Sequence, residues 1–327
     1  MSSWKGRTAL VTGAQGFIGS WLAERLLEEG ARVVALRRDF DPEARFRRDG
    51  VEERCAVVLA DVGDYESLVR VLNEHDVGSV FHLAAQTIVA TANRSPLSTF
   101  ETNVRGTYNL LEACRAVGVV GHPVERVVVA SSDKAYGSHE DLPYREEFAL
   151  SPRYPYDVSK ACTDMIARSY AFTYELPVAV TRLANVYGGG DLNWSRVVPD
   201  TCRALVRGER PVIRSDGTPE RDYIHVDDAV DAYLAVAESL DRPELRGRAW
   251  NAGAGAPLSV LEIVGRLTRV SGSQLEPDVQ GSATPHGEID RQVLDSTAIR
   301  QELGWAPRVG LDDGLRQTYD WYERRLS

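Results

Sequence analysis

Two short runs of the sequence carry side chains that could move protons during a reaction. One is YDVSK, from Tyr156 to Lys160, which places a phenol and an ammonium one helical turn apart. A phenol with a pKa of about 10 is a poor base at neutral pH, but a neighbouring cation lowers that pKa. Upstream, the apolar run Val127–Ala130 predicts a strand that delivers Ser132 at its carboxyl end, where ligands bind in parallel sheets. Together these runs predict a site for proton transfer.

A glycine-rich loop near the start of the chain predicts the cofactor for this chemistry. The predicted strand Thr8–Thr12 runs into GAQGFIG, residues 13–19, which opens a helix over Phe17–Glu29. Glycines in such a loop allow a tight turn and a close approach of the backbone to a pyrophosphate, whose charge the helix N-terminus attracts. We therefore expect a nicotinamide dinucleotide here. An oxidised nicotinamide beside Tyr156 would also lower the pKa of that phenol.

The end of the second predicted strand bears on which dinucleotide binds. An acidic residue usually stands there and binds the 2′-hydroxyl of the ribose. The sequence instead has Arg37, followed by Arg38 and Asp39, and a guanidinium at this place can bind a 2′-phosphate. The pattern favours NADP over NAD. The alternative is that both arginines are solvated and Asp39 supplies the acid.

Strands and helices alternate through much of the chain, which predicts an α/β fold with a doubly wound parallel sheet. After Asn185 the pattern becomes irregular and rich in glycine and proline. We predict a dinucleotide-binding Rossmann domain over 1–187 and 222–253, and a smaller, discontinuous C-terminal substrate-binding lobe over 188–221 and 254–327. The main predicted strands are Thr8–Thr12, Arg32–Leu36, Ala56–Ala60, Ser79–Leu83, Arg126–Ala130 and Val178–Leu183, and the helices between them are Phe17–Glu29, Tyr65–His75, Leu97–Val117 and Val158–Glu175.

The motifs, taken in order, resemble those of the extended short-chain dehydrogenase/reductase family over the whole chain. The RDYIHVDD run from Arg221 to Asp228 and the LGW run from Leu303 to Trp305 are typical of its nucleotide-sugar epimerases and dehydratases. The other matching motifs are the glycine loop, Asp61-Val62, His82-Leu83-Ala84-Ala85-Gln86, Asn103, Ser132 and the Tyr156–Lys160 run.

This resemblance implies a role for each matching residue. Tyr156 takes the proton of a sugar hydroxyl, Ser132 hydrogen-bonds the same oxygen, and Lys160 binds the nicotinamide ribose. The cofactor, NAD or NADP, is tightly held and recycled in each turnover. The residues expected to bind it are Gly13, Gln15, Gly16, Phe17, Ile18, Gly19, Arg37, Arg38, Asp61, Val62, Leu83, Ala84, Ala85, Tyr156 and Lys160, and those expected to bind a nucleotide-diphosphate sugar are Gln86, Asn185, Arg196, Val197, Arg221 and His286.

The residues after Ser132 bear on the reaction. Asp133 and Lys134 stand where dehydratases of the family carry an acid/base pair and simple 4-epimerases carry non-ionisable residues. Ser-Asp-Lys, the ANVYGGGD run from Ala184 to Asp191 and the PHGE run at 285–288 resemble the CDP-glucose 4,6-dehydratases. Elimination of water from a 4-keto sugar needs a base at C5 and an acid at O6 in addition to the tyrosine. Asp133 and Lys134 are the candidates, and which of them is the base stays open.

The resemblance therefore implies a nucleotide-sugar 4,6-dehydratase, with two alternatives. A 4-epimerase needs only Ser132, Tyr156 and transient oxidation of C4, and the stretch Arg221–His225 is closer to the epimerases. A non-catalytic NADP sensor on the same fold is more remote, because Tyr156 and Lys160 are both present. For Asp133 and Lys134 themselves, the alternative is an ion pair that only holds the loop.

Composition and charge exclude several kinds of partner. The 327 residues carry a formal net charge of −10 and a pI of about 5.2, which argues against nucleic acid. No apolar run is long enough to span a membrane, and the four cysteines are widely spaced, so we expect a cytoplasmic protein with no metal site. The helices over Leu97–Val117 and Val158–Glu175 resemble those that form a four-helix homodimer interface in the family. Their apolar residues Leu110, Leu111, Met165 and Ile166 could equally belong to the core.

Overall fold

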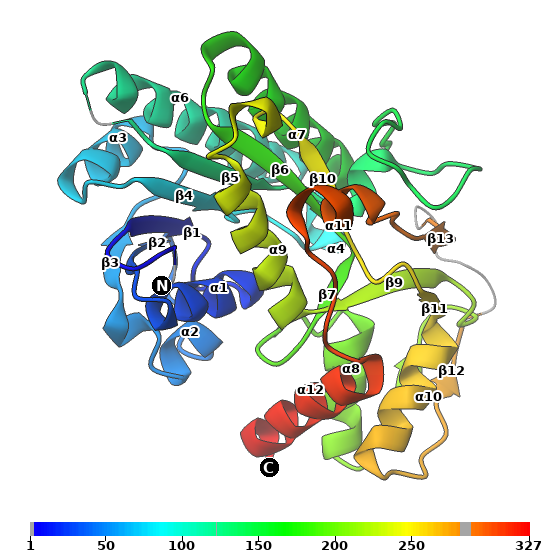
Figure 1. Ribbon diagram of the computed structural model, residues 1–327. Coiled ribbons are helices and arrows are strands. Elements are labelled where there is room, and N and C mark those ends of the chain that lie inside the picture. Colours follow the sequence, from blue (N-terminus) through cyan, green and yellow to red (C-terminus); the bar gives the residue numbers. More distant parts are fainter. Residues whose placement is uncertain (1–2, 122, 282–288) are drawn as a thin grey trace.

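The computed structural model describes residues 3–121, 123–281 and 289–327. Its largest element is a sheet of seven parallel strands in the order β3-β2-β1-β4-β5-β6-β10 (Figure 1). The strand order reverses beside β1, as it does in doubly wound sheets. The predicted α/β fold with a doubly wound parallel sheet is confirmed. The strands are β1 (Thr8–Thr12), β2 (Arg32–Arg37), β3 (Ala56–Leu59), β4 (Ser79–His82), β5 (Arg126–Ala130), β6 (Val178–Leu183) and β10 (Ala249–Ala252).

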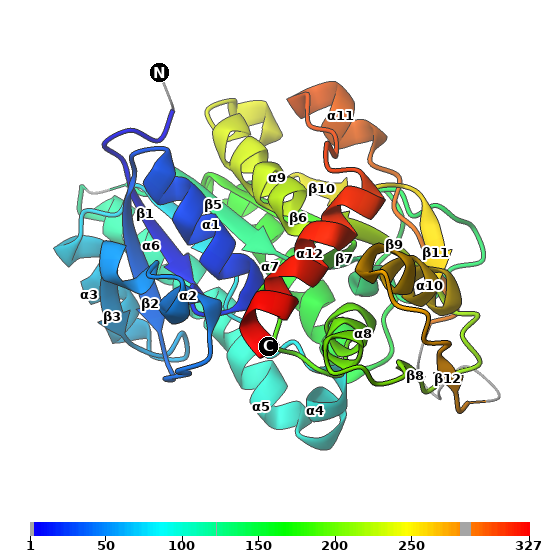
Figure 2. The same cartoon turned by 90° about the horizontal axis from the view of Figure 1, so that it is seen from below.

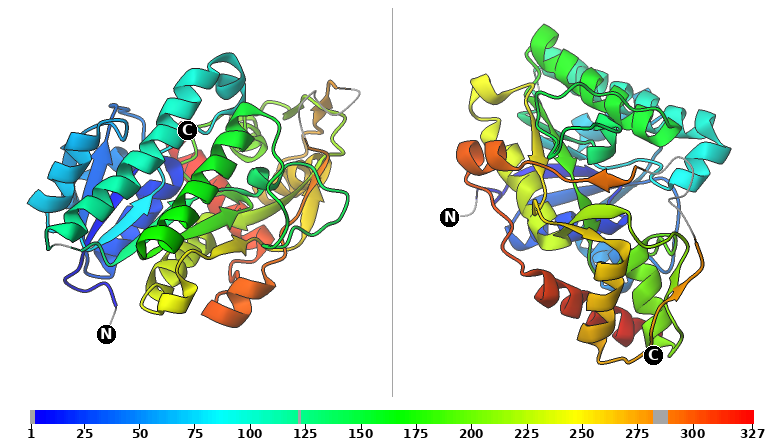
Figure 3. Two further views of the ribbon diagram at one scale, coloured as in Figure 1. Left: turned by 90° about the horizontal axis from the view of Figure 1, so that it is seen from above. Right: turned by 90° about the vertical axis from the view of Figure 1, so that its right-hand side faces the viewer.

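Helices cover both faces of this sheet, because successive side chains of each strand point to opposite faces. Along β5, Val127 and Val129 pack in one core, and Val128 and Ala130 pack in another. The first core is covered by α3 (Tyr65–Glu74), α6 (Gly106–Val119) and α7 (Pro155–Tyr174), and the second by α1 (Phe17–Glu28), α9 (Val226–Ser239) and α11 (Thr297–Leu303) (Figures 2 and 3). No helix in the described part of the chain is long and apolar enough to cross a lipid bilayer.

A smaller lobe has a third core of its own, built by α8 (Val197–Val206), α10 (Val260–Ser271) and α12 (Leu311–Leu326). In α10 the buried residues Ile263, Val264, Leu267 and Val270 repeat at helical spacing, so they form one apolar stripe. The short strands of the lobe are β7 (Asn185–Tyr187), β11 (Pro257–Ser259) and β13 (Arg291–Gln292), which all pair with β9 (Glu220–His225), and β8 (Val212–Ile213), which pairs with β12 (Asp278–Val279).

The chain passes between the large sheet and the lobe more than once. It leaves the sheet after β6, forms α8 in the lobe, returns with α9 and β10, and then supplies α10 and α12 to the lobe. Between those two helices, Ile299 of α11 and the nearby Trp305 pack in the core of the large sheet. The domain boundaries, 1–187 with 222–253 and 188–221 with 254–327, stay a prediction.

The predicted helix over Leu97–Val117 is helical throughout, but it is not one regular α-helix. The short helix α4 (Val89–Arg94) comes first. It is followed by α5 (Pro96–Phe100), a π-helical turn over Glu101–Arg105, and then α6. Within the π turn, the side chain of Asn103 accepts a hydrogen bond from the Gln86 amide at 2.7 Å and donates one to Ser159 at 2.8 Å. Turns of this kind are frequent at functional sites. Here the turn ties the loop after β4 to α7.

Helix α7 carries two of the predicted catalytic residues, and its ends follow from the local sequence. Pro155 stands in its first turn, where a missing N–H costs no hydrogen bond. Asp157 in the same turn interacts favourably with the positive end of the helix dipole. The helix ends where Glu175 takes a left-handed conformation with φ of 56°. Tyr156 and Lys160 therefore lie one turn apart near its N-terminus.

Candidate active site

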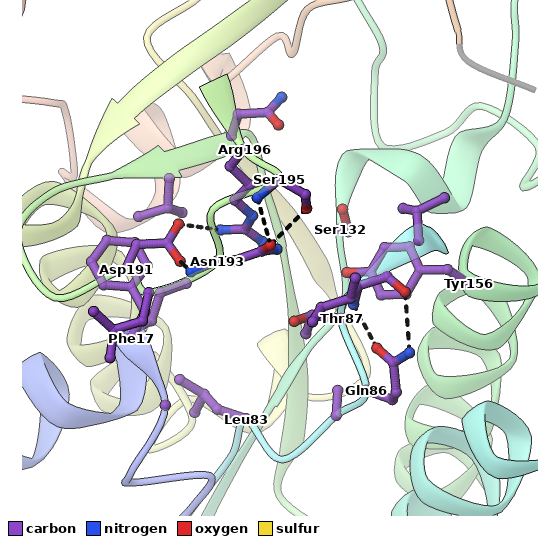
Figure 4. Close-up of a pocket in the computed structure, with 18 of the residues that line it drawn as sticks. Phe17, Leu83, Gln86, Thr87, Ser132, Tyr156, Asp191, Asn193, Ser195 and Arg196 are labelled. Carbon is purple, nitrogen blue, oxygen red and sulfur yellow. Dashed lines mark hydrogen bonds and ion pairs between the residues drawn. The ribbon is translucent and has the colours of Figure 1, made fainter. Parts of the chain in front are cut away.

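A cleft of about 1030 Å³ runs along the carboxyl ends of the large sheet and reaches the lobe. Figure 4 shows Ser132 and Tyr156 on one side of it and Asp191, Asn193 and Arg196 on the other. Asp61 does not line the cleft, and His286 lies outside the described residues. The predicted site residues that line it are Gly13, Gln15, Gly16, Phe17, Ile18, Gly19, Arg37, Arg38, Val62, Leu83, Ala84, Ala85, Gln86, Ser132, Asp133, Lys134, Tyr156, Lys160, Asn185, Arg196, Val197 and Arg221.

The glycine loop fits the pyrophosphate of a dinucleotide. Gly13 has φ of +72°, and a Cβ on it would lie 2.8 Å from the backbone nitrogen of Ala84. A Cβ on Gly19 would lie 2.2 Å from the carbonyl oxygen of Gly13, so the loop closes tightly only with glycine there. Helix α1 has no side-chain cap at Gly16 and no acidic residue in its first turn. Its N–H groups and its positive dipole end are thus available to an anion in the cleft.

The guanidinium of Arg37 is already engaged within the protein. It forms an ion pair with Glu52, and the Arg37 and Glu52 side chains are only 14% and 17% exposed. Arg38 is more open, with 53% of its side chain exposed, and it pairs with Asp39 at 2.7 Å. Asp61, which was expected to bind the cofactor, accepts a hydrogen bond from the Gly63 amide at 2.7 Å. Neither arginine therefore presents an unpaired charge to the cleft.

The hydroxyl of Thr12 helps to hold the loop after β4 against β1. Thr12 Oγ1 accepts hydrogen bonds from the amides of Leu83 and Ala84, each at 3.1 Å. The same atom lies 2.9 Å from Nδ1 of His82, whose other ring nitrogen lies 3.1 Å from Thr107. Burial lowers the pKa of His82 to about 3, and Lys160 acts in the same direction, so the imidazole stays neutral. These contacts fix the wall of the cleft next to the glycine loop.

Tyr156 and Lys160 are both buried at the floor of the cleft, 8% and 5% exposed. Burial raises the pKa of Tyr156 to about 12, against the opposing effects of the Arg196 guanidinium and the Ser132 hydroxyl. Lys160 Nζ donates a hydrogen bond to the Ala130 carbonyl at 2.8 Å, and burial lowers its pKa to about 8. Both shifts follow from the cost of a charge in a poorly solvated site.

Ser132, Asp133 and Lys134 stand side by side at the end of β5. The Ser132 hydroxyl donates to Asp133 Oδ1 at 2.9 Å, and the other carboxylate oxygen has no hydrogen-bond partner among the described residues. Asp133 is 4% exposed, and burial raises its pKa although the Lys134 ammonium acts against this. Lys134 Nζ donates instead to Gln292 of β13 at 3.4 Å. The carboxyl and the ammonium thus have different partners.

The opposite wall carries polar groups at the lobe side. Arg196 pairs with the buried carboxylate of Asp191 at 3.1 Å. The side-chain nitrogen of Asn185 is buried without a hydrogen-bond partner in the described part of the chain. Arg221 is 8% exposed and donates to the carbonyl oxygens of Glu220 and Asp290 at 2.9 and 3.3 Å. These groups suit an anionic, hydroxyl-rich ligand.

The glycine run before Asp191 is clamped by three elements. Trp21 of α1 donates from Nε1 to the Gly189 carbonyl at 2.7 Å, and Trp321 of α12 leaves no room for a side chain at Gly189. A Cβ on Gly190 would lie 2.8 Å from Cδ of Arg45, in the short helix α2 (Arg45–Arg48). Contact between α1, α2, α12 and this loop therefore sets where Asp191 stands.

Several cleft residues were not predicted from the sequence. Asp191 and Asn193 follow the glycine run, which marked a turn but did not indicate which side chains it presents. Thr87 lies in the loop after β4, and Tyr233 reaches the cleft from α9. The glycine run and the His82–Gln86 motif were the only local sequence signals near these residues. Their side chains reach the cleft through the packing of the lobe against the sheet, which the sequence does not indicate.

Proteins of known families are similar to this chain over nearly its whole length. A model of the family described as GDP-mannose 4,6 dehydratase matches residues 10–318. A CDP-glucose 4,6-dehydratase of Salmonella typhimurium is 30% identical over 98% of this chain and 91% of its own length.

Two solved structures are also similar to this chain. The UDP-glucose 4-epimerase of Thermotoga maritima, solved with UDP-glucose, has a TM-score of 0.87 at 30% identity and covers 98% of this chain and 100% of its own. The dTDP-glucose 4,6-dehydratase of Streptomyces venezuelae, solved with NAD bound, has a TM-score of 0.84 at 31% identity over 97% of each chain. Dehydratases and epimerases thus share this fold at comparable similarity.

Proposed function

Because the chain belongs to the GDP-mannose 4,6-dehydratase family of extended short-chain dehydrogenases/reductases, we propose that it is a nucleotide-sugar 4,6-dehydratase. The observation that carries the proposal is the carboxyl of Asp133, buried beside Ser132 and Tyr156 with one oxygen lacking a partner in the described residues. Such a carboxyl tends to hold a proton and can give it to a leaving hydroxyl. A 4-epimerase needs no such group.

A nicotinamide dinucleotide fits the glycine loop, because Gly13 and Gly19 leave room only for backbone and helix α1 is uncapped. Gly13, Gly16 and the N-terminus of α1 would hold its pyrophosphate, and Lys160 would hold its nicotinamide ribose. When bound, this cofactor would supply a reversible hydride acceptor, so that the sugar could be oxidised at C4 and reduced at C6 with no net oxidation.

The side chains of the chain itself carry the proton transfers. Tyr156, as phenolate, takes the proton of the C4 hydroxyl while Ser132 hydrogen-bonds the same oxygen. Once C4 is a ketone, the C5 proton is acidic, and Lys134 is the base that takes it. The C6–O bond breaks, and the oxygen leaves as water with the proton of Asp133. C5 finally regains the proton held by Lys134, and the proton that Tyr156 took from the C4 hydroxyl replaces, by exchange with solvent, the one that Asp133 gave to the water. The product is the 4-keto-6-deoxy sugar plus one water.

A mass measurement tests this function. The purified protein with its cofactor is incubated with CDP-, GDP-, UDP- and dTDP-glucose and with the mannose analogues, one at a time. We expect one of these to yield a product lighter by one water. Lys134→Met should abolish the water loss and spare the oxidation of C4. A product of unchanged mass would contradict the dehydratase and leave the enzyme an epimerase.

The 4-epimerase is the second candidate, favoured by the similarity to the Thermotoga maritima structure. An epimerase returns the hydride to the other face of C4 and uses only Ser132 and Tyr156. Under this alternative, Asp133→Asn would leave turnover within a few-fold of the natural protein. Galactose formed from a glucose nucleotide, without any loss of mass, would be the direct evidence.

We also propose that NAD, and not NADP, is the natural cofactor, which departs from the expectation based on Arg37 alone. Glu52 pairs with Arg37, so a 2′-phosphate brought beside this guanidinium would also meet a carboxylate. Arg37 also lies over the ring of Phe40. Related structures solved with NAD support this choice.

Titration calorimetry of Glu52→Gln tests the cofactor preference without using activity. Removing the carboxylate should tighten NADP binding by about tenfold, equal to about 1.4 kcal/mol, and leave NAD binding nearly unchanged. Glu53→Gln is the control, because Glu53 is an exposed neighbour. Tighter binding of NADP than of NAD by the natural protein would contradict the proposal.

We further propose a homodimer formed through α6 and α7. Leu110 and Leu111, which could have belonged to this interface, are fully buried in the core of the monomer. Met165 and Phe172 of α7 are 61% and 70% exposed, and they lie seven residues apart, on one face of the helix. Tyr108 of α6 adds a further exposed aromatic ring. Such a surface supports self-association of two copies through four helices.

A further inference from the structure

A fully buried ion pair lies beneath the cleft and is not part of the proposed chemistry. Arg182 of β6 and Asp164 of α7 are 1% and 0% exposed. They form a two-point contact, Nε to Oδ2 at 2.7 Å and Nη2 to Oδ1 at 3.0 Å. A two-point contact between a guanidinium and a carboxylate fixes both the distance and the orientation of the groups it joins. A pair without solvent access can therefore act as a rigid link between a strand and a helix.

The same guanidinium extends the link to a third element. Arg182 Nη1 donates to the Tyr136 hydroxyl at 2.7 Å, and that hydroxyl donates to Asn251 Oδ1 of β10 at 2.8 Å. Burial raises the pKa of Tyr136 to about 12, so the hydroxyl keeps the proton it donates. The ring of Tyr136 stacks on Tyr144 at 4.9 Å, which blocks its rotation out of the core. Tyr136 is thereby held at its hydroxyl and along its ring.

Tyr136 belongs to the turn that presents the acid/base pair. A 3-10 helix spans Asp133–Tyr136, so Asp133 and Lys134 at its start are rigidly connected to Tyr136 at its end. Asp164 lies one turn beyond Lys160 and two turns beyond Tyr156 on α7. The link from Tyr136 through Arg182 to Asp164 thus joins the turn carrying one pair of reactive groups to the helix carrying the other.

We infer that the buried link Tyr136–Arg182–Asp164 sets the position of Asp133 and Lys134 relative to Tyr156 and Lys160, and so couples water elimination to the oxidation of C4. This inference rests on the proposed dehydratase function. Tyr136, Arg182 and Asp164 are positioning residues, because the structure buries them away from the reacting groups. Oxidation needs only the groups of α7 and Ser132, whereas elimination also needs the turn. Loosening the link should therefore damage elimination more than oxidation.

The test uses Tyr136→Phe, which keeps the ring and removes only the hydroxyl. In single turnovers with the accepted nucleotide sugar, we expect reduced cofactor to appear within about twofold of the natural rate. Release of the dehydrated product should fall by about tenfold to a hundredfold, as misplacement of a reactive group by about an ångström can cause. Reduced cofactor should accumulate, and mass spectrometry should find released 4-keto sugar that has not lost water.

Controls separate positioning from a general loss of structure. Tyr170→Phe removes a hydroxyl from α7, the helix that carries Asp164, where it bonds Glu112 of α6 at 3.2 Å, and it should leave both steps unchanged. The thermal midpoint of each variant shows that it is folded. Equal slowing of oxidation and elimination in Tyr136→Phe, or no slowing of either, would overturn the inference. Failure of the natural protein to release water from any nucleotide sugar would instead overturn the proposed function.

Discussion

At the scale of single residues, burial sets the protonation of the groups along the cleft. Tyr156, Lys160 and Asp133 each have a pKa displaced toward the neutral form, because a charge in this site loses much of its hydration. The raised pKa of Asp133 favours its protonated form, which is the form that can act as an acid. Tyr156 is also protonated, and it becomes a base only when positive charge approaches, as Arg196 and an oxidised cofactor provide.

Asp133→Asn tests the assignment of the acid. The amide keeps the size of the side chain and can still accept from Ser132, but it cannot protonate O6. Dehydration should fall by about 100- to 10,000-fold, the usual contribution of a general acid, while C4 oxidation persists. Reduced-cofactor absorbance together with product mass measures both steps. Dehydration within a few-fold of the natural rate would show that another group delivers the proton.

Lys160 makes the stability of the protein without cofactor depend on pH. Its pKa is about 8 in the folded state against 10.5 when unperturbed, so between these values the unfolded chain binds more protons. The buried ammonium thus lowers the free energy of unfolding fully below pH 8, and this destabilisation disappears as the pH rises to about 10.5. Relative to Lys160→Met, the unfolding free energy of the natural protein should rise by about 3 kcal/mol over this range. Urea titrations at several pH values measure it, and parallel curves would contradict it.

At the scale of elements, the packing of helices on the Gly188–Gly190 run shapes the lobe side of the cleft. Helices α1 and α12 contact this run from two directions, and Asp191 follows it directly. Tyr322 of α12 donates to the Asp191 carbonyl at 2.5 Å, which adds a third constraint. The packing of α12 on this run therefore fixes the position of Asp191, and the Asp191 carboxylate in turn fixes that of Arg196.

Gly189→Ala should weaken substrate binding more than cofactor binding. Its Cβ would lie 2.4 Å from Cγ of Trp321, so the loop or the helix must move and take Asp191 with it. We expect the KM for the nucleotide sugar to rise by about tenfold and stability to fall by about 1–3 kcal/mol. Calorimetry should find cofactor affinity unchanged. Gly265→Ala is the control, because a Cβ there meets nothing within 4 Å; equal effects on both ligands would speak against this role of the loop.

The elements that the sequence predicted well are those with a strong local signal. Strands β1, β5 and β6 have the predicted bounds, because each contains a local run of β-branched and other apolar residues. Strand β10 was missed, since Ala249-Trp250-Asn251-Ala252 is short and mixed, and only tertiary pairing with β6 makes it a strand. The π-helical turn within Leu97–Val117 was not predicted for the same reason, because it depends on contacts of Asn103 with Gln86 and Ser159.

In the candidate site, too, the residues with a local sequence signal were predicted, and those that depend on tertiary packing were not. Motifs indicated the glycine loop, Ser132, Tyr156 and Lys160, because each requires particular residue types at a fixed local spacing. The pairing of Arg37 with Glu52 could not be inferred, since they lie fifteen positions apart with the short helix α2 between them. The same limit applies to Asp191 and Tyr233, which reach the cleft only through packing of the lobe.

At the scale of the whole molecule, the exposed apolar face of α7 should decide the oligomeric state. Met165→Glu places a charge on the proposed interface, where its desolvation opposes association. Analytical ultracentrifugation should find a dimer for the natural protein and a monomer for the variant at micromolar concentration. Leu59→Glu is the matched control, because Leu59 is 65% exposed on β3 at the far edge of the sheet. A monomeric natural protein, or a dimer unaffected by Met165→Glu, would contradict the interface.

The place of β10 in the large sheet also shapes how a new chain reaches its native state. β6 ends at Leu183, but the strand that covers its outer edge is not complete until Ala252. During synthesis at about 5–20 residues per second, that edge stays open for several seconds, with its hydrogen-bonding groups available to other chains. Arg182 also lacks the Asn251 end of its hydrogen-bonded link in this interval. Fragments that stop before Ala252 should therefore be sensitive to proteases and prone to aggregate, although they contain the glycine loop and both pairs of reactive residues.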